Sequence, residues 1–425
     1  NMDTTVSAGT DFFRYACGGW NDAHPLTAEY SRYGTFDELF ENSQKQLREL
    51  IEGLAAQKNN QAGSAAQKIG DLYNMAMDSV TLNKQGAEPV KAMLDKIAGM
   101  KDKSEIVPMM TEMAHIGIGT YFHSYVYADP KNSSLNIFQM GQGGINLGEK
   151  EYYLDTDSIT QNIREQYKLY IGKLFQLAGF SEADAQQKVA DVMELETAIA
   201  KVSRSATELR DPEANYHKMS FDELKKTIAG IDWDAYMKGL GIQAPAELNV
   251  EQVEPIQEVA RLMNTLPLSK HVSYLEYNLL DAAASCLSDD FVAARFDFYG
   301  KVLSGRQVNQ PRWKRAVNSV NGMLGELVGE MYVEKYFPAA AKERMVKLVK
   351  NLQTALGERI DAQEWMSDST KIRAHEKLAA FHVKVGYPDK WKDYSKLEIK
   401  NDSYWANVCR ASEWGFNDMY SRIGK

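Results

Sequence analysis

Residues 11–52 read "DFFRYACGGWNDAHPLTAEYSRYGTFDELFENSQKQLRELIE". The first half of this stretch crowds together aromatic residues, a cysteine, a glycine pair and a proline, whereas the second half has the spacing of an amphipathic helix. Thr35 and Glu38 are spaced as in a capping box, which predicts a helix start at this point. The apolar residues that follow form one stripe along the helix: Leu39, Phe40, Leu47, Leu50, Ile51 and Leu54.

The composition is that of a folded protein and excludes several classes. The 425 residues are 44% hydrophobic and 25% charged, so disorder is not the default. A formal net charge of −9 argues against a nucleic-acid partner, which needs a basic surface. No apolar run reaches the roughly 18–20 residues that span a bilayer, so we expect no membrane span in this chain. Three scattered cysteines are too few for a disulfide framework or a thiolate zinc site: Cys17, Cys286 and Cys409.

Helical periodicity dominates the rest of the chain and predicts a mainly α fold. One stretch, residues 119–154, is instead rich in aromatic and β-branched residues, and the turn residues 129–132 divide it. We therefore expect a β-hairpin there, followed by a glycine-rich loop, and a bend between helical layers at 207–219. The expected helices cover roughly 63–78, 84–98, 104–116, 158–179, 182–206, 250–265, 267–287, 289–303, 314–336, 340–364 and 367–384.

Two short motifs suggest chemistry but lack the required context. "GGINLGEK", residues 143–150, is close to a phosphate-binding loop, yet Glu149 stands where the motif needs lysine. "HEKLAAFH", residues 375–382, looks like a zinc-protease helix, but its two histidines are seven residues apart, roughly 10 Å along a helix. One metal ion cannot bridge that gap. The residues alone therefore indicate a large acidic helical protein with no self-contained catalytic or metal site.

Six segments in order along the chain carry a resemblance to a known family. They are "DFFRYACGGW" (11–20), "SRYGTFDELFENSQKQLREL" (31–50), "DPKNSSLNIFQMGQGGINLGEKEYYL" (129–154), "RDPEANYHKMSFDEL" (210–224), "RWKRAVNSVNGMLGELVGEMYVEKYF" (312–337) and "KVGYPDKW" (384–391). Together they resemble the N-terminal, mainly helical portion of the neprilysin and endothelin-converting-enzyme (PepO-like) family of zinc metallopeptidases. The resemblance covers nearly the whole chain.

The resemblance implies a two-lobed fold around a closed cavity, with this chain supplying the large multi-helix lobe and its small β-hairpin element. Residues 1–55 would then pack on the catalytic lobe, residues 56–385 would form the helical lobe, and residues 386–425 would return toward the catalytic domain. The chain starts without Met or a signal peptide and stops at "SRIGK", so we expect it to be a piece of a longer protein.

Zinc would be bound by the absent C-terminal half. In the family, a segment like "SRIGK" leads into the HExxH helix, a downstream Glu ligand and an Asn-Ala clamp on the substrate backbone, and none of these motifs occurs in this sequence. The resemblance therefore implies no catalytic residue and no metal ligand in this chain. The implied partners are oligopeptide substrates and the C-terminal portion of the same protein, in the periplasm or outside the cell.

Three residues of the opening stretch match positions of the family's substrate pocket. Arg32 matches the arginine that receives the substrate's C-terminal carboxylate, and Phe36 and Asp37 match neighbouring pocket residues. The family's second pocket arginine would fall at Phe40, which favours longer peptides over strict dipeptide release. Cys17 resembles a position that pairs with a C-terminal cysteine in animal members.

Other interpretations of the same residues stay open. Arg32 could instead hold a carboxylate such as Asp37 or Glu38 near the helix start, and helical periodicity alone places Phe36 in the core. Cys17 could equally be a free buried thiol. The whole chain could also be a non-catalytic binding or scaffold protein that kept the helical lobe and lost the protease half.

Overall fold

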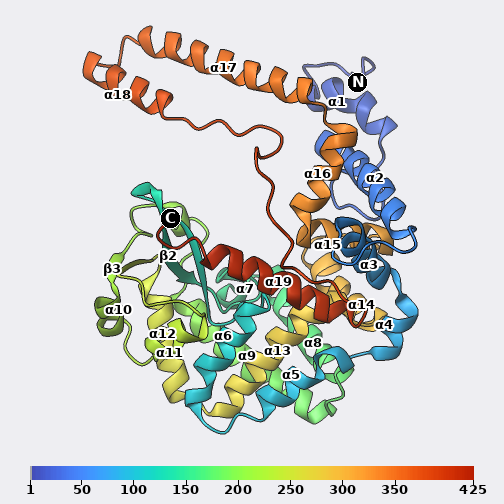
Figure 1. Cartoon of the computed structure of the whole chain (residues 1–425), viewed down its shortest axis with the longest axis vertical. Helices are drawn as coiled ribbons and strands as arrows, with labels where there is room; N and C mark the ends of the chain where they lie inside the picture. Colours follow the sequence, from blue (N-terminus) through green and yellow to red (C-terminus); the bar gives the residue numbers. More distant parts are fainter. Residues whose placement is uncertain (1) are drawn as a thin grey trace.

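The computed structural model describes residues 2–425 and is mainly α-helical, which confirms the expected fold class (Figure 1). The α-helices are α1 (Phe12–Ala23), α2 (Thr35–Ala55), α3 (Ala65–Met77), α4 (Ser79–Gln85), α5 (Glu88–Ala98), α6 (Ile106–His115), α7 (Glu151–Leu154), α8 (Ser158–Leu177), α9 (Glu182–Val202), α10 (Phe221–Thr227), α11 (Trp233–Gly239), α12 (Val253–Thr265), α13 (Leu268–Ala283), α14 (Asp289–Arg295), α15 (Arg312–Met323), α16 (Gly325–Tyr336), α17 (Ala339–Asp361), α18 (Asp368–Ala379) and α19 (Tyr404–Tyr420). Short 3-10 turns and a π-helix complete the helical part: η1 (Lys103–Glu105), η2 (Glu208–Arg210), η3 (Ala284–Cys286) and η4 (Phe296–Val302).

The predicted hairpin is present and forms half of a small sheet. Strands β1 (Phe122–Asp129) and β2 (Asn132–Gln142) pair antiparallel around the expected turn. Two further strands were not predicted, β3 (Lys218–Ser220) and β4 (Glu247–Val250), and the sheet order is β1-β2-β4-β3 with β2 parallel to β4. Strands of three and four residues are too short to show an alternating pattern in the sequence.

The segment 207–219 is attached to this hairpin and not to a second helical layer. Tyr216 Oη donates a hydrogen bond to Asp129 Oδ1 over 2.9 Å, and Lys218 Nζ lies 3.2 Å from Asp129 Oδ2. Asp129 is almost fully buried at the hairpin turn. The segment expected to be a bend therefore supplies a hydrogen bond and an ion pair to the buried carboxylate of Asp129 and leads into β3.

Several predicted helices are interrupted where the backbone leaves helical geometry. The range 314–336 is two helices, because Leu324 adopts φ −117° and ψ 30° between α15 and α16. The range 84–98 is divided at Gly86, whose φ of +54° favours glycine. Helices α1 and α19 were not predicted, since the crowded aromatic and glycine residues of the first obscured its period and the second fell in the expected return segment.

The central helix of the structure outside the arm of α17 and α18 is α13, which packs against α9, α8 and α5. Its buried side chains lie on all sides of the helix, from His271 to Ala283. A helix that is buried all round belongs to the interior of a large domain. The core of the helical body is thus built around α13.

A buried glutamate connects this core to the glycine-rich loop. Glu196 on α9 is 0% exposed, and its carboxylate accepts hydrogen bonds from Tyr153 Oη (2.7 Å), Tyr167 Oη (2.9 Å) and Asn146 Nδ2 (2.7 Å). Burial, opposed in part by these donors, raises the pKa of Glu196 to about 7. Asn146 belongs to "GGINLGEK", so this motif anchors the loop to the core.

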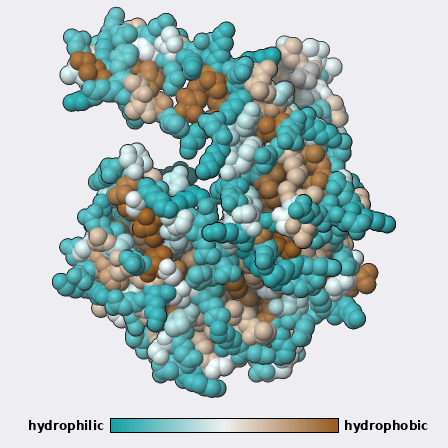
Figure 2. Space-filling view, viewed as in Figure 1, coloured by the Kyte–Doolittle hydropathy of each residue, from teal (hydrophilic) through white to brown (hydrophobic). Residues whose placement is uncertain are grey.

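Helices α17 and α18 form an arm that projects from the body (Figure 1). Neither helix has a buried residue, and the two pack on each other. The chain then returns without regular structure to α19. Figure 2 shows apolar side chains on the surface of this arm. Those on α17 are spaced three or four residues apart, as on the core-facing side of a helix: Met345, Leu348, Leu352 and Leu356.

The raised pKa of Glu196 predicts a specific pH dependence of stability. The folded chain keeps a proton on Glu196 up to about pH 7, whereas the unfolded chain releases it near the ordinary glutamate pKa of 4.5, so stability falls as the pH rises through this window. Glu196→Gln should not show this loss. Between pH 5 and pH 8 its free energy of unfolding should therefore rise by up to about 3 kcal/mol relative to that of the wild type. Urea unfolding at both pH values measures the difference.

The matched control is Glu182→Gln, which changes an exposed glutamate on the same helix. Its free energy of unfolding should follow the wild-type pH profile. Equal pH slopes for the wild type and Glu196→Gln would contradict the raised pKa.

Candidate functional site

The loop 24–34, between α1 and α2, carries Arg32 and is fixed by the body of the protein. The carbonyl oxygen of Ala28 accepts hydrogen bonds from the backbone N–H groups of Gln307 (2.9 Å) and Val308 (3.0 Å). Trp20 of α1 stacks on His24 with a ring separation of 4.3 Å, and on Tyr33 at 6.2 Å. Backbone pairing and aromatic stacking thus hold both ends of the loop.

A partly buried ion cluster holds the middle of the loop. Lys314 of α15 has a side chain only 8% exposed, and its Nζ lies 2.9 Å from Glu29 and 2.8 Å from Glu41. Tyr30 Oη also donates to Glu41. Burial opposes ionisation of Glu41, but the hydrogen bonds from Lys314 and Tyr30 outweigh it and keep its pKa below the ordinary value. Sequence reasoning missed Lys314, although a lysine inside an apolar helix period is a signal for a buried ion pair.

The side chain of Arg32 is exposed and unpaired within residues 2–425. The two carboxylates that were expected as alternative partners are both directed elsewhere. Asp37 Oδ2 accepts from the Gly34 N–H over 2.9 Å, and Glu38 lies 3.9 Å from His24. The alternative in which Arg32 serves to hold one of these carboxylates is therefore wrong.

Asp37 caps the helix that follows the loop. The N-cap is Gly34, one residue earlier than the predicted Thr35, and Asp37 takes the position that Glu38 was expected to fill. An acidic side chain in the first helical turn also interacts favourably with the helix dipole. Asp37 thus fixes the start of α2, close to Arg32 in the sequence.

Phe36 is 86% exposed, so the prediction from periodicity that it belongs to the core is wrong. Leu39 and Phe40 are exposed as well, whereas Ile51 at the other end of the stripe is fully buried. From Glu41 onward α2 packs on the rest of the structure, chiefly against α3 and α15. Phe36, Leu39 and Phe40 lie before this contact, and their side chains are left exposed.

No three or more histidine, cysteine or acidic side chains come together to hold a metal ion within the described part of the chain. His375 lies 2.7 Å from Asp361 on the neighbouring helix, and His382 lies beyond the end of α18. The cysteines at positions 17, 286 and 409 are all free thiols here, with Cys17 half-buried. Over the same residues no helix is long and apolar enough to cross a membrane.

The fold is shared with solved metalloproteases. The chain superposes on the zinc metalloprotease Zmp1 of Mycobacterium tuberculosis, solved with an inhibitor, with a TM-score of 0.93 and 32% identity over 99% of this chain and 64% of Zmp1. PepO from Lactobacillus rhamnosis has the same fold, with a TM-score of 0.85 at 18% identity, over 97% of this chain and 66% of PepO. The fold is therefore that of a metallopeptidase lobe.

The family model described as peptidase family M13 matches residues 8–388, so the chain belongs to this family. Endothelin-converting enzyme 1 of Rattus norvegicus is 29% identical over 424 residues, which are 96% of this chain and 54% of the relative. The human membrane metallo-endopeptidase-like 1 is 26% identical over 445 residues, covering 96% of this chain and 56% of the relative. The resemblance to the N-terminal portion of the neprilysin and endothelin-converting-enzyme family is thereby confirmed, and the chain spans about half the length of these curated relatives.

Removing the Lys314 ammonium should destabilise the protein more than removing an exposed one. Lys314→Ala leaves two carboxylates without their cation, and the cost should lie between the ~1 kcal/mol of an exposed pair and the ~3–5 kcal/mol of a buried one. Lys335→Ala on α16 breaks the exposed pair with Glu49 and should lower the free energy of unfolding clearly less than Lys314→Ala does. Chemical unfolding of both variants makes the comparison, and equal costs would show that the cluster does not hold the loop.

Proposed function

We propose that this chain is the N-terminal, substrate-confining portion of a zinc metalloendopeptidase that hydrolyses oligopeptides. The observation that carries the proposal is the match to peptidase family M13 over residues 8–388, in a chain that spans about half the length of its relatives. Zinc would be held by the C-terminal portion, because the described residues offer no group that fits it. When bound there, zinc would polarise the scissile carbonyl and help to generate the attacking water.

In this proposal the contribution of the chain is to bind and orient the peptide. Arg32 is exposed, unpaired and mounted on a fixed loop, which suits a guanidinium that must accept a carboxylate from solution. Phe36 would contact the peptide through its exposed ring, and Asp37 would keep the helix start in place. Phe40 stands where the family has a second arginine, so a single cation would receive the terminus and longer peptides would be tolerated.

The exposed apolar residues of the chain fit a large intramolecular partner. They are concentrated in the N-terminal segment and on the arm, at Phe12, Phe13, Leu26, Phe36, Leu39, Phe40, Leu348, Leu352, Trp365 and Ile372. Exposed apolar side chains gathered in two regions in this way suit an interaction site. We assign it to the C-terminal catalytic portion, with the whole protein in the periplasm or outside the cell.

Arg32→Ala should impair substrate binding and leave folding intact. In the protein that includes the catalytic portion, the variant should weaken peptides with a free C-terminal carboxylate by about 10- to 150-fold, the equivalent of roughly 1.5–3 kcal/mol. C-terminal amides of the same peptides should be affected much less. Arg32→Lys should recover only part of the loss, because lysine lacks the planar fork. The kinetic constants for matched acid and amide peptides measure the effect.

The control for Arg32→Ala is its melting temperature, which should stay within about a degree of the wild type since the side chain makes no contact that folding needs. An equal loss on acids and amides would assign Arg32 a different role.

Zinc should bind only where the catalytic portion is present. The 425-residue chain should carry far less than one zinc after gel filtration, whereas the protein that continues into an HExxH helix should carry one and lose peptide hydrolysis with a chelator. Metal analysis of both proteins decides the matter. A stoichiometric zinc on the shorter chain would refute the proposal, and a reading frame without an HExxH helix would favour a scaffold protein.

A further inference from the structure

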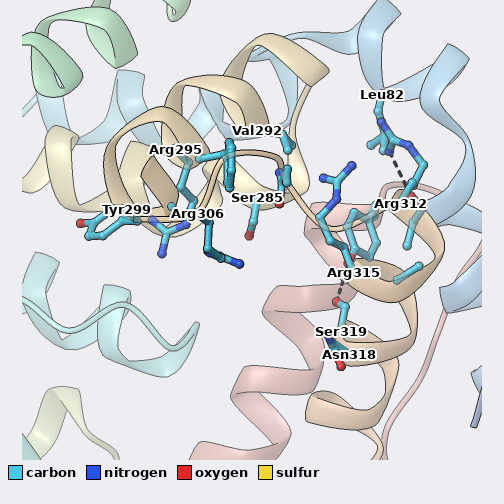
Figure 3. Close-up of a pocket in the computed structure, with 16 residues that line it drawn as sticks. Leu82, Ser285, Val292, Arg295, Tyr299, Arg306, Arg312, Arg315, Asn318 and Ser319 are labelled. Atoms are coloured by element: carbon cyan, nitrogen blue, oxygen red, sulfur yellow. Dashed lines mark hydrogen bonds between the residues drawn. The ribbon is translucent and has the colours of Figure 1, made fainter. Parts of the chain in front are cut away.

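A cavity of about 500 Å³ lies between α3–α4, α14–η4, α15 and the start of α19 (Figure 3). Four arginines line it: Arg295 from α14, Arg306 from the loop after η4, and Arg312 and Arg315 from α15. No aspartate or glutamate is among the lining residues that the structure describes. A cavity with four cations and no anion is unusual in a chain whose net charge is −9.

Two of these arginines are neutralised by carboxylates outside the lining. Arg295 Nη1 lies 2.8 Å from Asp281 Oδ1, and Arg312 pairs with Asp289. Arg312 also donates to the carbonyl oxygen of Ala76 over 3.2 Å. These pairs account for two of the four positive charges.

The other two, Arg306 and Arg315, have no carboxylate partner within residues 2–425. Arg315 donates through Nε to the carbonyl oxygen of Gln310 over 3.2 Å. Arg306 stands 5.5 Å from the ring of Phe296, and its Nε is buried without an acceptor. Burial, together with the neighbouring charge of Arg312, lowers the pKa of Arg315, and Asp289 offsets part of this shift. Both side chains are partly buried and neither forms an ion pair with a described carboxylate, which leaves their charge incompletely compensated.

The remaining lining supplies groups that suit an anionic ligand. Helix α15 begins at Arg312 without a side-chain cap, so the positive end of its dipole lies at a residue that lines the cavity. Polar groups of Ser285, Asn309 and Tyr404 also line the cavity, and Tyr299 provides an aromatic wall. The volume is large enough for an organic anion or for an acidic side chain with part of its backbone.

We propose that this cavity is a binding site for an oxyanion, a carboxylate or a phosphate group, held by Arg306 and Arg315. Guanidinium groups bind both kinds of oxyanion bidentately, so the shared chemistry admits two sources: an acidic residue of a peptide or a free phosphate compound. The site goes beyond peptide hydrolysis and does not depend on the zinc chemistry. It stands on the uncompensated charge of the cavity alone.

The test measures anion binding to the 425-residue chain by calorimetry at constant ionic strength. The probes are inorganic phosphate, citrate and a Glu-Glu-Glu peptide, with chloride as the reference anion. We expect saturable binding of at least one probe. Tighter binding of phosphate would identify a phosphate compound as the ligand, and tighter binding of citrate or the Glu-Glu-Glu peptide would identify a carboxylate. The double variant Arg306→Gln/Arg315→Gln should weaken that binding at least about tenfold.

Two further variants keep the result interpretable. Arg373→Gln removes an exposed arginine on α18 and should bind the probe as the wild type does. Arg306→Lys/Arg315→Lys keeps both charges without the fork and should bind with intermediate affinity, which tests the site even if the Gln variant is poorly folded. The inference is overturned if no probe binds above the chloride background, or if the Lys and Gln double variants both retain wild-type affinity.

Discussion

The ammonium group of Lys314 makes the interaction on which the arrangement of the surface around Arg32 depends. It joins three segments, since Glu29 and Glu41 lie 285 and 273 residues from it in sequence. A cation at a position this shielded is unfavourable unless both carboxylates reach it, and that requires α15, the loop 24–34 and α2 to meet in one geometry. The loop can therefore expose Arg32 to solvent while its backbone stays fixed. A ligand that bound to Arg32 would then not have to order the loop.

Sequence patterns predicted the helices with clear periods and the hairpin, because local burial dictates those patterns. They failed where a tertiary contact decides the structure. The four residues of β4 become a strand only because β2 is available beside them. Leu324 interrupts a continuous apolar period without any glycine or proline to announce the break. The resemblance to a known family predicted the family and the overall helical fold, because it rests on matching segments and not on local propensity.

The candidate site illustrates the same limit at the level of single side chains. Periodicity placed Phe36 in the core because it assumes that every apolar stripe has a partner, and at the start of α2 the described residues provide none. The pairing of Arg32 could not be decided either, since sequence proximity to Asp37 and Glu38 says nothing of where their side chains point. Overall charge was equally uninformative about the arginine-lined cavity, because a net value averages over local fields.

The arm has a mechanical consequence. At the base of the arm α17 contacts the returning segment: Lys342 Nζ donates to the carbonyl oxygen of Tyr387 over 2.8 Å and lies 3.0 Å from Asp389. Helix α17 as a whole has 23 residues and is about 34 Å long at 1.5 Å per residue. No buried side chain ties α17 to the body, so a rotation at its base leaves the core undisturbed. Because α17 is long, a rotation of about 10° at Pro338 would move its far end by roughly 6 Å. A small change of backbone angle near Tyr387 would therefore produce a large displacement at the tip of the arm.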